Sequence, residues 1–262
     1  VRSERMIQRI MDNLLWLHDQ IDPVIRARSK LWYDGAEQIA EKWSIKYGIF
    51  KSQAAGMLAV LSPQKDWFMN VTMAERVIDI LHGKMDHTFD SKMRASSFQF
   101  LLKEGSKDVA DQKNMRNYDL VKGKTLREAI ATNNQEAIGL WIRAYDEAYH
   151  SRDGMESSRA WGGFDALGKA ASIFIDGSPE NINAKLGGEH KVRNFYNNIF
   201  NPSDPRFATI DTHAVAAALL TPFGGSDRPV AMNFGKSGGS NETGVSGTYP
   251  IYLEAYKRAA EA

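Results

Sequence analysis

The chain has 262 residues, of which 43% are hydrophobic and 25% are charged, a composition typical of a folded globular protein whose core needs neither a metal ion nor a disulfide. It contains no cysteine, which excludes disulfides and cysteine-ligated zinc or iron–sulfur clusters and is consistent with a reducing cytoplasm. The formal net charge is only +1, so any nucleic-acid-binding surface must be a local basic patch. No long uncharged apolar run is present, and we expect no membrane span.

Apolar residues recur at helical spacing along most of the chain, whereas no segment shows the alternation typical of a strand. The sequence therefore predicts an all-α fold. The predicted helices cover about residues 7–21, 34–48, 52–61, 67–81, 92–103, 138–149, 159–175, 191–200, 212–220 and 248–261.

Two regions interrupt this periodicity. Residues 103–125 are polar and rich in charge, which predicts an exposed excursion between helices. Residues 221–248 are rich in glycine and serine, and a loop of this length inside a compact domain is either functional or without fixed structure.

The first motif with a chemical interpretation covers residues 60–70, where an apolar helix meets Ser62-Pro63 and ends. Gln64 and Lys65 follow in an exposed junction, a place suited to a side chain that enters a DNA stack. The simpler alternative is a Ser-Pro turn in which Asp66 caps the next helix.

The second motif is a short Gly187-Gly188 hairpin between two predicted helices. Outward backbone N–H groups of such a hairpin can bind a phosphate, and the cations Lys191 and Arg193 follow. The alternative is a glycine that ends one helix and is followed by a solvated basic turn.

The third motif is Asp211, which follows an extended segment and precedes an alanine-rich helix. A helix N-terminus stabilises a negative carboxylate, so Asp211 is a candidate catalytic group. Asp211 is also a candidate N-cap, and the two interpretations are compatible. As a helical neighbour, His213 points elsewhere, and a structural role is favoured for it.

Two other chemistries are not supported. Gly235-Lys236-Ser237 ends like a phosphate-binding P-loop, but Val230 stands where that motif requires glycine. The six histidines show no metal-binding spacing, and neither a metal nor a cofactor is expected.

Taken in order, the three motifs resemble those of the helix-hairpin-helix DNA glycosylase superfamily, whose best-known branch is endonuclease III. The corresponding segments are 61–66 with Asn70, then 186–191, then 210–213. The resemblance implies one glycosylase-like unit over residues 1–262 with two helical lobes. One lobe would cover about 52–200 with the hairpin at 186–190, the other about 1–51 plus 201–262, and the active-site cleft would lie between them.

The resemblance also implies roles for individual residues. Asp211 corresponds to the catalytic carboxylate and Lys191 to the lysine that forms a Schiff base in bifunctional members. Gln64 corresponds to the residue that fills the gap left by a flipped base. The other implied DNA contacts are Lys65, Asn70, Gly187, Gly188, His190 and Arg193.

Some features depart from the repair enzymes. The hairpin is one residue short, the stretch between the first two motifs is long, and the loop at 224–247 is extra. In these departures the chain resembles a phage-associated offshoot, the amino acid:DNA transferases and thymine pyrophosphorylase-like proteins. These are thought to replace a pyrophosphate on the 5-methyl carbon of uracil in DNA with an amino acid or polyamine, which yields hypermodified thymidine.

By this resemblance Arg228, Lys236 and Ser237 would hold the leaving pyrophosphate. The expected partners are DNA and a free amino acid or amine, and the expected setting is a monomer in the cytoplasm of a phage-infected bacterial cell. Two alternatives stay open, a DNA glycosylase that excises a damaged or modified base and a DNA-binding module without activity.

Overall fold

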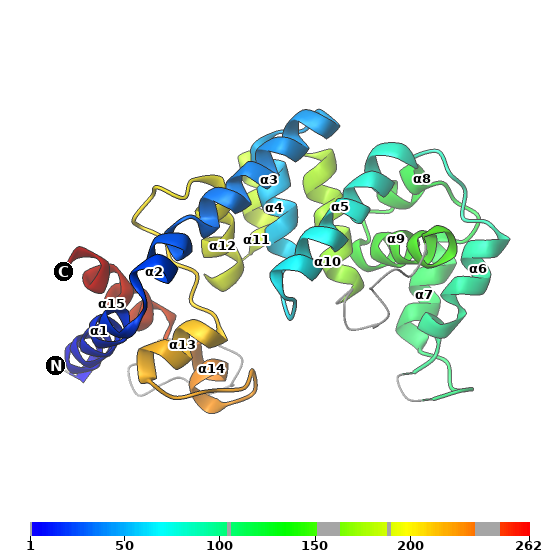
Figure 1. The fold of residues 1–262 in the computed structure, drawn as a ribbon. Coiled ribbons are helices and arrows are strands. Elements are labelled where there is room, and N and C mark those ends of the chain that lie inside the picture. The colour runs from blue at the N-terminus through cyan, green and yellow to red at the C-terminus, as the bar shows by residue number, and fades with distance from the viewer. Residues whose placement is uncertain (1, 104–105, 151–162, 188–189, 234–246) are drawn as a thin grey trace. The chain divides into compact units, whose positions relative to one another are not determined.

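The computed structural model describes residues 2–103, 106–150, 163–187, 190–233 and 247–262. Within these ranges every regular element is a helix, and strand-like pairing is limited to the isolated bridges Thr88–Thr125 and Leu102–Ala110, which confirms the all-α prediction. The helices, drawn in Figure 1, are α1 Arg2–Gln20, α2 Pro23–Lys30, α3 Trp32–Tyr47, α4 Lys51–Val60, α5 Trp67–Gly83, α6 Ser91–Ser97, the 3-10 turn η1 Phe98–Leu101, α7 Gln112–Val121, α8 Leu126–Ala131, α9 Gln135–Tyr149, α10 Phe164–Ile175, α11 Pro179–Leu186, α12 His190–Phe200, α13 Thr212–Leu219, α14 Arg228–Asn233 and α15 Tyr249–Glu261.

Each helix predicted from periodicity is present, and side-chain caps explain several of the boundaries. Asp66 accepts a hydrogen bond from the Met69 backbone at 2.8 Å and begins α5, which confirms the capping interpretation of this residue. Asp90 begins α6 in the same way, through the Met93 backbone at 2.9 Å. Such caps satisfy N–H groups that have no partner within the helix.

The prediction of an exposed excursion over 103–125 was wrong for its second half. Residues 112–121 form α7, which Asp111 caps and which buries Tyr118 and Val121. So few buried apolar positions give no clear helical period, and for that reason the pattern was missed. The predicted loop 221–248 likewise contains α14, and its residues 234–246 lie outside the described ranges.

The chain divides into two compact units. The central unit comprises residues 41–187, and the terminal unit comprises residues 1–40 and 188–262. The lobes implied by the resemblance have their boundaries near 51 and 200 instead. No described helix is both long and apolar enough to cross a membrane.

Helix α9 is the centre of the central unit and contacts α6, α7, α8 and α10. Two glycines allow α9 and α10 to approach closely. A Cβ added at Gly139 would lie 2.0 Å from the backbone oxygen of Phe164, and one added at Gly168 would lie 2.0 Å from that of Gln135. Only glycine fits at either position without separating the helices.

The terminal unit joins the two ends of the chain, since α1 and α15 lie side by side, the blue and red helices of Figure 1. The described core of this unit consists of Ile7, Ile10, Ile210, Val215, Ala218, Val230, Tyr249, Tyr252 and Ala255. A polar contact adds to this packing, because the side-chain amide of Asn13 donates to the Ala218 carbonyl at 2.9 Å. The helix that follows Asp211 is therefore fixed to α1.

Candidate functional site

Asp211 is the N-cap of α13. Its Oδ1 accepts a hydrogen bond from the Ala214 backbone at 2.8 Å, which confirms the capping role. The residue is half-buried, and no described residue donates a hydrogen bond to Oδ2. The carboxylate thus combines a fixed position with one oxygen that a ligand can use.

The hydroxyl of Tyr249 holds the backbone just before Asp211. It donates to the Ala208 carbonyl at 2.7 Å and accepts from the Ile210 N–H at 2.9 Å. Tyr249 is the first residue of α15 and is only 1% exposed. One buried side chain therefore satisfies two backbone groups of an extended segment that pairs with no strand in the described ranges.

Two asparagines complete this clamp on residues 207–210. Asn198 of α12 donates to the Phe207 carbonyl at 3.0 Å and accepts from the Thr209 hydroxyl at 3.0 Å. Asn233 of α14 donates to the Ile210 carbonyl at 3.1 Å. Each such bond contributes about 0.5–1.5 kcal/mol net, so the segment is well restrained.

Three tyrosines lie within electrostatic reach of Asp211 and stay protonated well above neutral pH. Burial raises the pKa of Tyr33 to about 12; the charge of Asp211 acts in the same direction, whereas a hydrogen bond with Thr209 opposes it. Burial also raises the pKa values of Tyr249 and Tyr256, and the negative charge of Asp211 adds to both effects. Near neutral pH the carboxylate therefore has neutral phenols around it.

This arrangement has a definite chemical capacity. A carboxylate held at a fixed place can stabilise a developing positive charge or accept a proton without first reorganising its surroundings. Neutral phenols do not compete with it for protons in the physiological range. Among the described residues no group of three metal-ligating acidic or histidine side chains occurs.

Helix α12 brings another predicted residue to this site. The exposed ring of His190 stacks on the ring of Tyr249, with centroids 5.3 Å apart and an interplanar angle of 21°. Lys191 and Arg193 follow on the same helix and are half-buried. Arg228 is the exposed first residue of α14. The predicted site residues Gly188, Lys236 and Ser237 lie outside the described ranges.

The remaining predicted residues belong to the central unit. Gln64 is exposed between α4 and α5, as expected, and its φ of 60° is in the left-handed region. Lys65 turns its Nζ back to the Pro63 carbonyl at 3.2 Å. Asn70 is only 1% exposed, so in this structure its side chain cannot reach DNA as predicted.

Gly187 also differs from its predicted role. Its N–H donates to the Asn183 carbonyl at 3.2 Å, and its φ is 59°. The group that was expected to point outward to a phosphate therefore ends α11 instead, as in the alternative interpretation.

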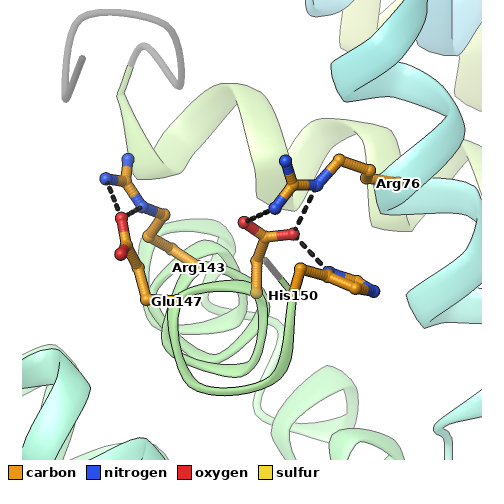
Figure 2. A network of polar contacts seen from close by, with 5 residues as sticks. Arg76, Arg143, Glu147 and His150 are labelled. Carbon is orange, nitrogen blue, oxygen red and sulfur yellow. Dashed lines mark hydrogen bonds and ion pairs between the residues drawn. The ribbon is translucent and has the colours of Figure 1, made fainter. Parts of the chain in front are cut away.

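A second carboxylate, Asp146 of α9, has its partners in Arg76 and His150, which Figure 2 labels. Arg76 of α5 donates two hydrogen bonds to it, at 2.8 and 2.7 Å, and the Nδ1 of His150 lies 2.5 Å from its Oδ1. One turn away, Arg143 donates to Glu147 at 2.6 and 3.0 Å. Asp146 is 3% exposed and both of its oxygens have partners, so it joins helices and presents no oxygen to a ligand.

The site includes residues that the sequence analysis did not assign to it. Tyr33, Tyr249, Tyr256, Asn198 and Asn233 all contact or influence the Asp211 segment. Nothing in the local sequence around Tyr33 indicates that it lies near Asp211.

Comparisons with known proteins give a match over the first part of the chain. The model of a protein family of unknown function, DUF7178, matches residues 1–117. This range contains Tyr33 and the Gln64 turn but ends well before Asp211. No curated protein and no solved structure matches the chain.

Proposed function

We propose that this protein modifies bases in DNA and that Asp211 is its catalytic carboxylate. The observation that carries the proposal is a carboxylate whose Oδ2 accepts no hydrogen bond from the described residues, whose preceding backbone is clamped by two side chains, and whose charge acts on neutral phenols. A carboxylate held in this way, with one oxygen that is not used in the helix cap, is suited to electrostatic and acid–base catalysis.

The reaction that we favour transfers an amine to 5-pyrophosphomethyluracil in DNA. The nitrogen of a free amino acid or polyamine attacks the exocyclic methylene carbon, a C–N bond forms and the C–O bond to pyrophosphate breaks. Pyrophosphate leaves with the electron pair of that bond. The attacking nitrogen loses one proton, which Asp211 accepts and then releases to water.

Arg228 supports this choice of leaving group, since it is an exposed cation on α14, the helix that also supplies Asn233 to the Asp211 segment. A cation at this place can neutralise a departing pyrophosphate. The choice of DNA as the substrate rests on the resemblance of the three motifs, in their order, to those of the helix-hairpin-helix DNA glycosylases.

The experiment offers the full chain a DNA oligonucleotide that carries 5-pyrophosphomethyluracil, together with a mixture of amino acids and polyamines. We expect a new nucleoside by mass spectrometry after digestion, and one equivalent of released pyrophosphate. Unchanged nucleosides and no pyrophosphate, with single- and double-stranded DNA alike, would overturn the proposal.

Base excision is a second candidate, favoured by one observation. Lys191 directly follows His190, whose ring stacks on the tyrosine that clamps the Asp211 segment. Excision with a lysine nucleophile predicts abasic DNA and a covalent adduct that borohydride traps. A trapped adduct that is lost in Lys191→Gln would favour excision over transfer, whereas intact strands with every candidate base would remove it.

A further inference from the structure

Helix α2 has an unusual surface for a helix of a folded protein, because none of its residues is buried. Val24 is 65% and Ile25 57% exposed, and Leu31 just after the helix is 63% exposed. A helix without a buried face is expected to be covered by a partner or to bind a ligand.

The same helix concentrates positive charge. Arg26, Arg28 and Lys30 lie on it, and no acidic residue occurs between Asp22 and Asp34. The excess of three cations over these few residues contrasts with a net charge of +1 for the whole chain. Such a local patch is the electrostatic signature of a surface that binds a polyanion.

Helix α2 is held firmly in spite of its exposure. Asp22 caps it by accepting from the Val24 backbone at 2.8 Å, and Pro23 fits the first turn. At its other end the Leu31 N–H donates to the Arg28 carbonyl at 3.1 Å, and the Gly35 N–H donates to the Leu31 carbonyl at 3.0 Å, which connects α2 directly to α3.

Trp32 joins this basic helix to the candidate site. The residue is 42% exposed, and its ring packs edge-on against Tyr33, with centroids 4.7 Å apart, and at a tilt against Phe195 of α12 at 6.2 Å. Tyr33 in turn bonds with Thr209 and is within electrostatic reach of Asp211. An indole is thus fixed beside the site with part of its surface toward solvent.

We propose that α2 and Trp32 form the surface that binds a single strand of DNA next to Asp211. Arg28 and Lys30 contact backbone phosphates, and Trp32 stacks on a base adjacent to the one that is modified. Aromatic stacking on unpaired bases together with cations along the backbone is how proteins bind single strands without sequence preference. This inference rests on the proposed action on DNA and adds the residues that hold the strand.

The test measures binding, which does not depend on whether catalysis occurs. Fluorescence anisotropy measures the affinity of the full chain, and of the double variant Arg28→Gln/Lys30→Gln, for a labelled oligothymidylate at several salt concentrations. We expect weaker binding and a salt dependence that falls by about 1.4 in slope, since each lost contact with a single strand removes about 0.7. Because both side chains are at the surface, this variant is expected to fold.

The matched control is Lys103→Gln/Lys107→Gln, which removes the same charge from exposed positions of the central unit. It should leave both affinity and salt slope nearly unchanged. Equal losses in the two double variants would mean that net charge alone acts, and that result would overturn the assignment to α2.

Two substitutions of Trp32 test stacking. Trp32→Ala should weaken binding by about 5- to 150-fold, whereas Trp32→Phe should retain most of the affinity. The exposed Phe98 of the central unit supplies the control, since Phe98→Ala should have no effect. Binding of Trp32→Ala that equals the parent, with its fold verified by circular dichroism, would contradict the stacking role.

The arms of the experiment separate the two proposals. Binding that depends on α2, without a new nucleoside in the transfer assay, would leave this surface standing and remove the proposed reaction. A second arm uses anionic phosphatidylglycerol vesicles, because a basic helix with exposed apolar residues also suits a membrane surface. Sedimentation with vesicles and no binding to DNA would overturn the inference.

Discussion

The two units each hold a carboxylate at a fixed position, and the two carboxylates have opposite surroundings. In the central unit Asp146 is 3% exposed, and Arg76 and His150 occupy both of its oxygens. In the terminal unit Asp211 is half-buried, uses one oxygen as a helix cap and faces neutral phenols. A carboxylate with charged partners stabilises the fold, whereas one that retains a usable oxygen can act on a ligand.

The amount of backbone restraint differs in the same sense. In the central unit α9 and α10 meet at two glycines, where the contact is made by backbone atoms. In the terminal unit one extended segment before Asp211 forms backbone hydrogen bonds with the side chains of Asn198, Tyr249 and Asn233. Three side chains devoted to a few backbone groups suggest that the position of the residue after them matters.

The largest expected effect comes from Asp211→Asn. Asparagine caps a helix about as well as aspartate, so the free energy of unfolding should change by less than about 0.5 kcal/mol. Loss of the charge should lower the transfer rate about 10²- to 10⁴-fold. The positive charge that develops on the attacking nitrogen is then no longer stabilised, and the proton that this nitrogen loses has no acceptor. Parallel urea unfolding and pyrophosphate release measure the two quantities. A rate within tenfold of the parent would remove Asp211 from catalysis.

Asp146→Asn should show the reverse. The half-buried Arg76 would face a neutral amide in place of the buried carboxylate, and breaking such a largely buried ion pair costs about 3 kcal/mol. Urea unfolding should report this loss, while the transfer rate per folded molecule stays near that of the parent. A stable protein with lost activity would mean that the roles assigned to the two carboxylates are interchanged.

Much of this fold follows from local patterns, whereas the site follows from them only in part. The periodicity that predicts α1, α5 and α9 records which face each helix buries, and a cap such as Asp66 is encoded within three residues of its partner. Helix α7 escaped prediction because only a few of its positions are buried. The helix start at Asp211 could be recognised from its neighbours in sequence.

The surroundings of Asp211 could not be recognised in this way. Tyr33 and Tyr249 come from opposite ends of the chain, and only the packing of the terminal unit brings them to the same carboxylate. The same holds for Gly139 and Gly168, because a glycine inside a helix looks unfavourable until the neighbouring helix is in place. Asn70 shows the opposite error, since a polar residue near a motif was taken as a surface contact although it is buried.

Gly139→Ala tests the close contact in the central unit. Its new methyl group would meet the Phe164 carbonyl oxygen at 2.0 Å, so α9 and α10 must move apart, at a cost of about 3 kcal/mol. The control is Gly35→Ala in α3, where a Cβ meets nothing within 4 Å and the better helix propensity should stabilise the protein by up to about 1 kcal/mol. Thermal unfolding compares them, and equal midpoints would contradict the described packing.

Tyr249→Phe tests the clamp in the terminal unit. It leaves the buried Ile210 N–H without its acceptor, which should cost about 1–2 kcal/mol. The transfer rate per folded molecule should also fall about tenfold, because the Asp211 segment is less firmly positioned. Tyr252→Phe is the control, since that residue is equally buried on α15 but its hydroxyl bonds to no described residue. Equal rates in the two variants would mean that the clamp does not position Asp211.

The smallest effect is a change in alkaline titration. Burial and the Asp211 charge raise the pKa of Tyr33 to about 12, above the ordinary value near 10, so the folded protein holds this proton more tightly than the unfolded chain does. The resulting stability is complete below pH 10 and is lost as the pH rises from 10 to about 12. Tyr33→Phe should therefore make the fall in stability over this window shallower. In a tyrosinate absorbance titration it should remove about one ninth of the total amplitude, since the chain has nine tyrosines, and that ninth should come from the part that titrates well above pH 10. If the lost amplitude came instead from the part that titrates near pH 10, Tyr33 would be exposed to water. It would then not be one of the buried neutral phenols that distinguish the surroundings of Asp211 from those of Asp146.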